Sequence, residues 1–267
     1  LQRSSWRTRR LKSVVYKKAR QTIAALNRLC SSYVKFPVTR DGWDQIEQGF
    51  RRASGFPHVC GAIDYILIAI QRPKDYGGWY NRKGYPSCNV QVVCDDKKRF
   101  MSFDLRPDSW SDQKIWKHSR LGCSVSSIIP SGYHFLGDAG YALSHSLLTP
   151  SLSVDADGTR DESLFNYIRS STRMVIEGAV GLLKEKRRIL KKPLEEKRTQ
   201  TAVQVIVACI VFHNLFIELS TLPESSDEIV VGCTGACIPS PSQIVERDLA
   251  LAKHKRRKFV ALFASQR

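Results

Sequence analysis

The segment from Gly61 to Ile70 limits most strongly what this chain can fold into. It is almost entirely apolar, and its one charged residue is Asp64. A short, nearly continuous apolar run is typical of a β-strand buried on both faces of a sheet. A carboxylate inside such a strand is costly unless it is paired or bound to a metal ion. An Asp at a strand end that faces water is the alternative, and the apolar residues on both sides of Asp64 make it the weaker one.

A second short apolar segment, residues 134–138, ends on an acidic residue, Asp138. Open α/β sheets place their sites in the loops at the carboxyl ends of strands. Asp138 is therefore a candidate partner of Asp64. Taken alone, a turn-forming or helix-capping Asp explains this residue equally well.

The third acidic candidate, Glu177, lies on a long helical pattern in the second half of the chain. At 100° per residue, Phe165 and Ile176 share one apolar face, and Glu177 lies on a neighbouring stripe with Arg173 and Lys184. Taken alone, Glu177 is better explained by an ion pair with Arg173, four residues earlier. Two strand-borne Asp residues and the basic residues that follow change this balance.

The order of the expected elements defines the fold class. Several strands come first, then an α-β alternation, then two closing helices, which indicates an α/β protein with a mixed sheet flanked by helices. The expected strands cover 61–70, 89–95, 99–106 and 134–138, and the expected helices cover 6–30, 43–52, 109–121, 164–190 and 199–219.

The net charge of +17 is concentrated in three segments. Residues 1–57 carry 13 Lys and Arg against 3 Asp and Glu, residues 184–198 carry 8 against 3, and residues 253–258 carry five basic residues. Basic segments around a mildly acidic remainder suit a polyanion such as DNA, because each neutralised phosphate releases counterions. Solvated charged faces, kept for solubility, rarely give so one-sided a distribution.

Three basic residues are the specific candidates for binding DNA. Lys184 and Arg188 share the helical stripe of Glu177, and Arg187 adjoins it, so phosphates bound there would lie near the acidic residues. The run 253–258 is typical of a nuclear-import signal or a flexible tail. The helix expected at 6–30 is basic and amphipathic, so a DNA-binding arm and a packing helix explain it equally well.

Cysteines and the longest apolar stretch exclude two other classes of protein. The eight cysteines are scattered in a chain too long to depend on disulfides, so we expect them to be reduced. Cys233 and Cys237 have no second Cys or His pair to complete a zinc site. The stretch from Val203 to Leu219 is interrupted by polar residues, which excludes a membrane span.

Short motifs across residues 36–218 resemble the PIF/Harbinger transposases, and the nucleases derived from them, in the Asp-Asp-Glu superfamily. Their shared order makes the resemblance specific. The matching pieces are Gly55-Phe56-Pro57, Gly61-Ala62-Ile63-Asp64, Asn81-Arg82-Lys83-Gly84-Tyr85, Asn89-Val90-Gln91-Val92-Val93-Cys94-Asp95, Leu136-Gly137-Asp138-Ala139-Gly140-Tyr141, Leu148-Thr149-Pro150, Phe165-Asn166, Glu177 with Gly181, Leu183 and Lys184, and Cys209 with His213-Asn214.

This resemblance implies a ribonuclease-H-like fold and a catalytic, metal-binding triad of Asp64, Asp138 and Glu177, with 38 residues between the last two. It implies a divalent-metal-dependent nuclease that holds two ions of Mg²⁺ or Mn²⁺, double-stranded DNA as the substrate, a nuclear location and a separate Myb-like accessory DNA-binding protein. Two-metal cleavage needs hard oxygen ligands that hold the ions about 3.5 to 4 Å apart, so we expect the three carboxylates to converge.

The resemblance also suggests a division of the chain. Residues 1–57 are expected to be a basic helical arm left from, or linking to, an upstream DNA-binding domain. Residues 58–220 are expected to form the ribonuclease-H-like catalytic domain, and residues 221–267 a loosely ordered basic tail. The pair His213-Asn214 is expected to be a structural cap or a packing pair on the last helix of the catalytic domain.

The chain departs from the family pattern at three places. The family follows its first Asp with Gly-Thr-His, where this chain has Tyr65-Ile66-Leu67. Its Pro-Gly-Ser with a nearby His-Asp becomes Pro107-Asp108-Ser109 with Ser111-Asp112, which leaves Asp112 as a reserve acidic ligand. The upstream helix-turn-helix is missing or reduced. Two hypotheses follow: an active endonuclease or transposase, and an inactive or domesticated copy that only binds DNA or a protein partner.

Overall fold

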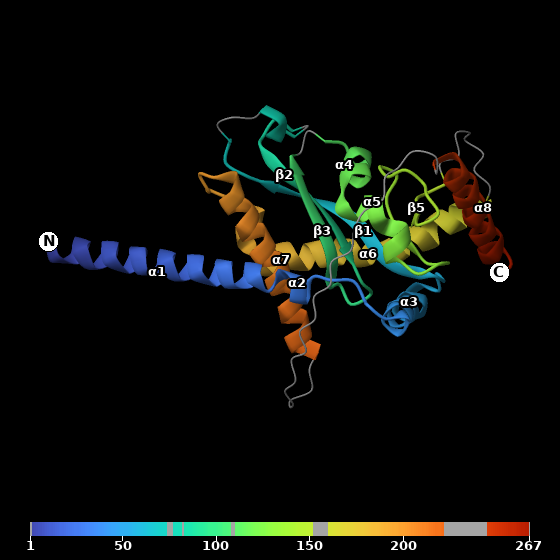
Figure 1. The fold of residues 1–267 in the computed structure, drawn as a ribbon, viewed down its shortest axis with the longest axis horizontal. Coiled ribbons are helices and arrows are strands. Elements are labelled where there is room, and N and C mark those ends of the chain that lie inside the picture. The colour runs from blue at the N-terminus through green and yellow to red at the C-terminus, as the bar shows by residue number, and fades with distance from the viewer. Residues whose placement is uncertain are drawn as a thin grey trace.

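A computed structural model describes residues 2–73, 77–81, 83–107, 110–151, 160–221 and 245–266. Its centre is a five-stranded sheet with the strand order β3-β2-β1-β4-β5 (Figure 1). The strands are β1 (Val59–Ala69), β2 (Ser87–Cys94), β3 (Phe100–Pro107), β4 (His134–Leu136) and β5 (Leu147–Leu148).

The sheet is mixed. The hairpin-connected strands β1, β2 and β3 are antiparallel, whereas β1 with β4 and β4 with β5 pair in parallel. The turn between β2 and β3 is the predicted one: Asp95 accepts hydrogen bonds from the backbone N–H groups of Lys97 and Arg99. These pairings confirm the predicted α/β class, and the arrangement is consistent with a ribonuclease-H-like fold.

Helices cover both faces of the sheet. The described helices are α1 (Gln2–Arg28), α2 (Cys30–Tyr33), α3 (Arg40–Ser54), α4 (Asp112–His118), α5 (Arg120–Ile128), α6 (Arg160–Lys186), α7 (Thr199–Thr221) and α8 (Val245–Ala264), with the short 3₁₀ helices η1 (Gly77–Trp79) and η2 (Arg188–Lys191). Alternate residues of β1 belong to different layers, because strand side chains alternate between faces. Ala62 and Ile66 pack with Ile176 of α6, whereas Ile63 packs with Trp116 of α4.

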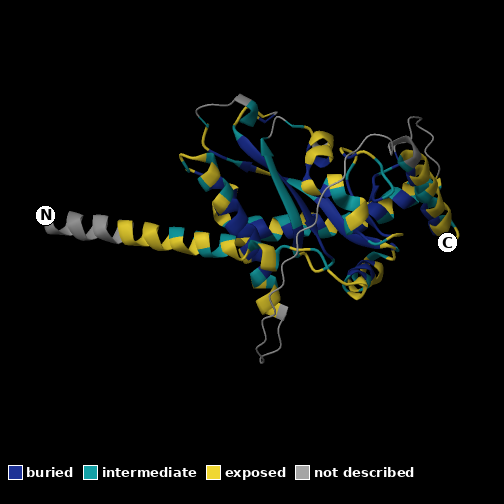
Figure 2. Ribbon diagram, viewed as in Figure 1, coloured by how far each residue is buried: buried dark blue, intermediate teal, exposed yellow. Residues whose placement is uncertain are grey.

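The long helix α6 crosses one face of the sheet and is mostly buried on one side (Figure 2). Its buried face includes Phe165, Ile176 and Leu183, as the sequence periodicity predicts. It also includes Arg169, which is 6% exposed. The helix therefore places both apolar and charged side chains against the sheet.

Helix α7 packs on the same face of the sheet as α6. Its stretch Thr199–Ser220 is long and apolar enough to cross a membrane by length and composition, a test that the core helix of a soluble protein also passes. More than half of that stretch is buried, and Ile206 and Ile210 are fully buried in the core. In this structure α7 is thus a core helix.

The first helix, α1, extends away from the rest of the molecule (Figure 1). Its last turns contact the neighbourhood of α7, where Asn27 donates a hydrogen bond to the Gln204 carbonyl and Arg20 pairs with Glu196 at 2.6 Å. A DNA-binding role for this basic helix stays a prediction. The boundary proposed at residue 57 does not separate two cores, because Trp43 and Phe50 of α3 belong to the same buried cluster as β1.

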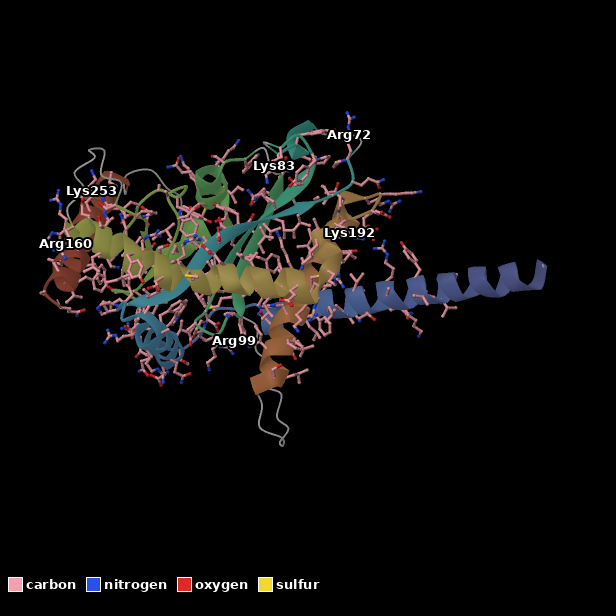
Figure 3. All side chains as sticks on the ribbon, turned by 180° about the vertical axis from the view of Figure 1, so that it is seen from behind. Arg72, Lys83, Arg99, Arg160, Lys192 and Lys253 are labelled. Atoms are coloured by element: carbon pink, nitrogen blue, oxygen red, sulfur yellow. The ribbon has the colours of Figure 1, made fainter. Side chains whose placement is uncertain are left out.

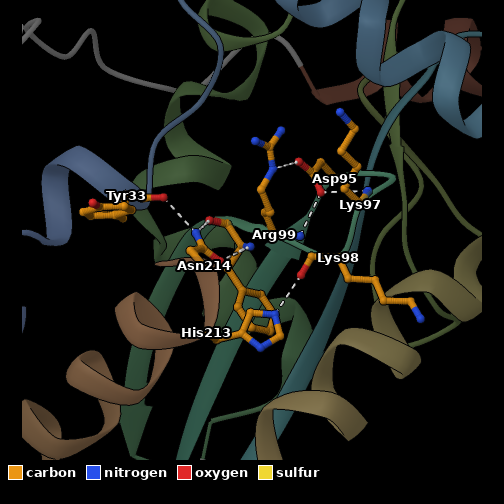
Figure 4. Close-up of polar contacts among 8 residues, drawn as sticks. Tyr33, Asp95, Lys97, Lys98, Arg99, His213 and Asn214 are labelled. Carbon is orange, nitrogen blue, oxygen red and sulfur yellow. Dashed lines mark hydrogen bonds and ion pairs between the residues drawn. The ribbon is translucent and has the colours of Figure 1, made fainter. Parts of the chain in front are cut away.

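His213 and Asn214 lie within α7 and form the packing pair of the two predicted alternatives, not a cap of the helix end (Figure 4). The side chain of Asn214 accepts a hydrogen bond from the Phe100 N–H and donates to the carbonyls of Phe100 and Tyr33. His213 donates from Nε2 to the Lys98 carbonyl at 2.9 Å. The pair thus ties α7 to the β2–β3 turn and α2. A cavity of about 510 Å³ lies beside Asn214, away from all three acidic candidates, none of which lines it.

The expectation of a loosely ordered tail is wrong for residues 245–264, which form α8. Phe259 and Phe263 are buried in the main core cluster. Lys255, expected in a flexible tail or import signal, is half-buried. Its ammonium group donates to the carbonyls of Gly132, Tyr133 and His145, and burial lowers its pKa to about 8.

One local difference from the expected elements has a simple cause. The helix expected at 109–121 is divided into α4 and α5, because Ser119 leaves helical geometry and its Oγ accepts a hydrogen bond from Gly122 N–H at 2.9 Å. A Cβ atom on Gly122 would lie 1.8 Å from the Trp116 carbonyl oxygen.

Six cysteines are free in the described part, while Cys233 and Cys237 lie outside the described residues.

Candidate functional site

Strands β1 and β4 bring Asp64 and Asp138 close together at the point where their parallel pairing ends. Their parallel pairing aligns Ala62 with Leu136, and the two Asp residues follow two positions later in each chain. Neighbouring strands lie about 4.8 Å apart, and residues two apart share a face. The carboxylates interact, since the Asp138 charge contributes to raising the pKa of Asp64. The predicted pair is therefore brought together by the strand register.

Asp138 lies just beyond β4, in a turn. Its Oδ1 accepts a hydrogen bond from the Gly140 N–H at 3.0 Å. This hydrogen bond shows that Asp138 does form a turn, which is its alternative explanation. This hydrogen bond uses one carboxylate oxygen, so turn formation and a second role for Asp138 are compatible.

Glu177 joins Asp64 through a shared arginine of α6. Arg173 donates from Nη1 to Asp64 Oδ2 at 3.0 Å and from Nη2 to Glu177 Oε1 at 2.5 Å. Both carboxylates therefore lie on the same side of the sheet. Asp64 is 23% and Glu177 51% exposed in the side chain. Glu177 does form the ion pair with Arg173 that is its alternative explanation. The same guanidinium also pairs with Asp64 of β1.

Asp64 lies in an environment that disfavours its charged form. Burial raises its pKa above the ordinary value, the Tyr65 N–H and Arg173 oppose this effect, and the Asp138 carboxylate adds to it. A carboxyl group in this position gains from any additional cation, because a nearby positive charge stabilises the ionised form.

Arg169, which sequence reasoning did not select, lies one turn before Arg173. It is buried and donates from Nη1 to the Gly137 carbonyl, beside Asp138. Burial and repulsion by Arg173 lower its pKa to about 10, and attraction by Asp138 opposes them. The spacing of Arg169, Arg173 and Glu177 at intervals of four residues on α6 is the sequence signal that marks this row.

Tyr65, the departure from the family pattern beside Asp64, packs away from Arg173. Its ring stacks on Tyr141 with centroids 5.0 Å apart, and Trp116 meets Tyr141 edge-on. Consecutive strand residues face opposite sides, so Tyr65 lies toward α4 while Asp64 lies toward α6. The pKa of Tyr141 is raised well above its ordinary value, chiefly by burial.

Two of the three basic candidates lie beyond the helix that carries the predicted stripe. Helix α6 ends at Lys186, so Arg187 and Arg188 do not continue its face. Arg187 is committed to α7: its guanidinium lies 4.0 Å from the Phe212 ring centroid and donates to the Phe212 carbonyl. The predicted stripe is wrong for Arg188, which is exposed on η2.

Lys184 is on α6 as predicted, and its ammonium group donates to the Leu67 carbonyl at 3.4 Å. Burial lowers its pKa. The reserve ligand, Asp112, is the first residue of α4, and its side chain lies outside the described residues.

The donor set of the acidic site suits a hard divalent cation, because Mg²⁺ and Mn²⁺ prefer carboxylate oxygens. Asp64 lies near Asp138 through the strand register and is linked to Glu177 through Arg173. Within the described residues, however, no group of three acidic, His or Cys side chains has the geometry of a formed metal site. The metal-binding role of the triad stays a prediction.

Comparison with known proteins identifies relatives. The family model described as DDE superfamily endonuclease matches residues 63–214, which include all three acidic candidates. The curated protein "Putative nuclease HARBI1" of Rattus norvegicus is 30% identical over 198 residues, covering 73% of this chain and 56% of the relative. Its human counterpart is 30% identical over 202 residues, with the same coverage.

A plant protein also matches. The "Protein ALP1-like" of Arabidopsis thaliana is 26% identical over 193 residues, covering 66% of this chain and 47% of that protein. The chain thus spans about half the length of the curated relatives it matches. No solved structure matches it.

Proposed function

Because the chain belongs to the DDE superfamily endonuclease family, we propose that it is a divalent-metal-dependent endonuclease that cleaves phosphodiester bonds of double-stranded DNA. The observation that supports the proposal is the linkage of Asp64 to both other acidic candidates. The guanidinium of Arg173 contacts both Asp64 and Glu177, and the negative charge of Asp138 contributes to raising the pKa of Asp64.

In this proposal the three carboxylates are the ligands of two Mg²⁺ or Mn²⁺ ions. The ions supply activation of the attacking water or 3′-hydroxyl and stabilisation of the leaving oxygen. Asp64 and Asp138 hold the site from the sheet, where the parallel register fixes their separation. Glu177 would complete the site from α6. The hydrogen bond from Arg169 to the Gly137 carbonyl holds the backbone just before Asp138.

The charge distribution supports DNA as the partner. From behind, basic side chains lie at both ends of α6, with Arg160 and Lys253 at one end and Lys192 at the other (Figure 3). Helix α6 therefore presents the acidic residues between positively charged ends. Such an arrangement attracts the phosphate backbone on both sides of a cleavage site.

We also propose, from the family resemblance, a nuclear location and a separate Myb-like protein that recognises the DNA target. A DNA-binding role for the basic N-terminal helix belongs to the same proposal. Pull-down of a Myb-like protein with the full chain, and fluorescence imaging of tagged protein, are the measurements that check them.

Removal of metal tests the proposed reaction. We expect the protein to nick supercoiled plasmid DNA in Mg²⁺ or Mn²⁺, and EDTA to reduce nicking to the level of a protein-free control, because carboxylates alone cannot activate the nucleophile. Excess Mg²⁺ added after EDTA should restore the rate. Nicking that continues unchanged in EDTA would contradict a metal-dependent mechanism.

Salt-dependent DNA binding tests the contact surface. Changing Lys184 and Arg188 together to Ala should weaken binding uniformly across sequences. It should also lower the slope of log K against log [salt] by about 0.9 for each lost phosphate contact. Fluorescence anisotropy at several salt concentrations measures this slope.

A matched control removes two basic residues from outside the basic segments. Lys117 and Arg120 are exposed on α4 and α5, and their double change to Ala should leave the slope nearly unchanged. Equal slopes for the wild type and the Lys184→Ala, Arg188→Ala protein would show that this end of α6 does not touch the DNA backbone.

A further inference from the structure

Arg173 occupies the oxygen atoms that a metal ion would need. Its side chain is only 14% exposed, and its two terminal nitrogens contact Asp64 Oδ2 and Glu177 Oε1. One planar cation thus bridges two carboxylates from different elements. A divalent ion held between the same two residues would make the same bridge.

Only one of the groups bound to Asp64 can leave without moving the backbone. Oδ1 accepts a hydrogen bond from the Tyr65 N–H at 2.9 Å, and Oδ2 accepts from Arg173. Tyr65 is fixed in β1, where it pairs with Gln91 of β2. Arg173 is a long side chain on α6, which can change its rotamers, so it is the group that can be exchanged.

Its neighbour on α6 has a different role. Arg169 is buried and donates to a backbone carbonyl, that of Gly137, rather than to a carboxylate. It can therefore remain in place when the carboxylates gain another cation. The two arginines of the row are thus distinguished by what they bind: one holds the backbone before Asp138, and the other neutralises the acidic pair.

We propose that Arg173 is a positioning residue that competes with the divalent ion. It holds Asp64 and Glu177 together in the metal-free protein and is displaced from them when metal binds. This inference rests on the proposed metal-dependent function. It predicts that removing the guanidinium tightens metal binding, although it also removes an ion pair that stabilises the metal-free protein.

Titration of Mn²⁺, followed by the loss of the free-ion signal in electron paramagnetic resonance, tests the competition. We expect Arg173→Gln to bind Mn²⁺ about tenfold more tightly than the wild type, because a competing cation that contacts both carboxylates is removed. Arg173→Lys, which keeps the charge but lacks the planar fork, should be intermediate. In EDTA, Arg173→Gln should melt at a lower temperature than the wild type.

Two controls make the outcomes distinct. Lys186→Gln removes an exposed charge from the same helix and should leave the Mn²⁺ affinity unchanged, whereas Asp138→Asn should weaken it. If Asp138→Asn weakens binding but Arg173→Gln binds as the wild type does, or less tightly, the competition is overturned and the metal site remains. If Asp138→Asn binds Mn²⁺ as the wild type does, or no variant binds it, the proposed function falls as well. Should Arg173→Gln not fold, an Arg173→Lys affinity no higher than that of the wild type overturns the competition.

Discussion

Replacing Phe56 with Ala is expected to lower the free energy of unfolding by about 3 to 5 kcal/mol, the usual cost of emptying a buried aromatic site. Phe56 is fully buried. The centroid of its ring lies 5.0 and 5.2 Å from the ring centroids of Phe263 and Phe259 on α8. It lies 5.9 Å from the ring centroid of Phe165 on α6 and 5.7 Å from that of His134 on β4. The loss would be a large part of the 5 to 15 kcal/mol that stabilises a typical domain, so the variant should unfold at much lower urea concentration.

The matched control is Tyr167→Ala. Tyr167 is an aromatic residue of α6, close in sequence to Phe165, but it is 72% exposed. Its removal should change the free energy of unfolding by no more than about 0.5 kcal/mol. Equal urea midpoints for the two variants would show that α8 does not pack on the core through Phe56.

The sequence predicts the elements whose pattern is local and repeated. Residues 61–70 are almost continuously apolar, and apolar residues recur every three or four positions on the buried face of α6. The sequence therefore predicts both the strand that carries Asp64 and the helix that carries Glu177. These patterns are strong because burial on both faces, or on one helical stripe, leaves little choice of residue type. The relation of Asp64 to Asp138 follows from the same pattern, since parallel strands deliver their carboxyl ends to one edge.

The elements that were missed depend on tertiary contacts. Helix α8 is obscured by its basic run, yet Lys255 is stabilised by three backbone carbonyls that come from residues 132–145. Strand β5 has only two residues, so it shows no alternation. Arg187 was assigned to DNA because its charge is visible in the sequence, whereas the ring of Phe212 that holds it lies on another helix.

The acidic site shows the same division. The elements that carry its three acidic candidates could be predicted. The buried position of Arg169 and the bridging position of Arg173 could not, because an arginine on a helix is usually solvated and its partner depends on how the helix crosses the sheet. Tyr65 adjoins Asp64 in the sequence, yet its ring does not lie beside the Asp64 carboxylate. Strand alternation, confirmed by its stacking on Tyr141, directs it to the opposite face from Arg173.

The second large effect is expected for Asp138→Asn, which should lower the rate of Mg²⁺-dependent plasmid nicking by roughly a thousandfold or more. Losing a charged metal ligand removes several kcal/mol of transition-state stabilisation, and each 1.36 kcal/mol is a factor of ten. Asn keeps the size of Asp and can still accept the Gly140 hydrogen bond that forms the turn. The fold should therefore survive, which a circular dichroism melt would check.

The control for this loss is Glu185→Gln, which removes a carboxylate from an exposed position of α6, eight residues after Glu177. We expect it to nick as fast as the wild type. If neither the wild type nor Glu185→Gln nicks DNA in any divalent metal while DNA binding is retained, the inactive, DNA-binding copy becomes the better account.

The most direct test of the central claim is therefore one plasmid-nicking time course in Mg²⁺ with purified wild type, Asp138→Asn and Glu185→Gln at equal concentration. Asp64, Asp138 and Glu177 acting as one metal-binding site predict nicking by the wild type and by Glu185→Gln, and none above background by Asp138→Asn. Equal nicking by the wild type and Asp138→Asn would contradict the assignment of the site.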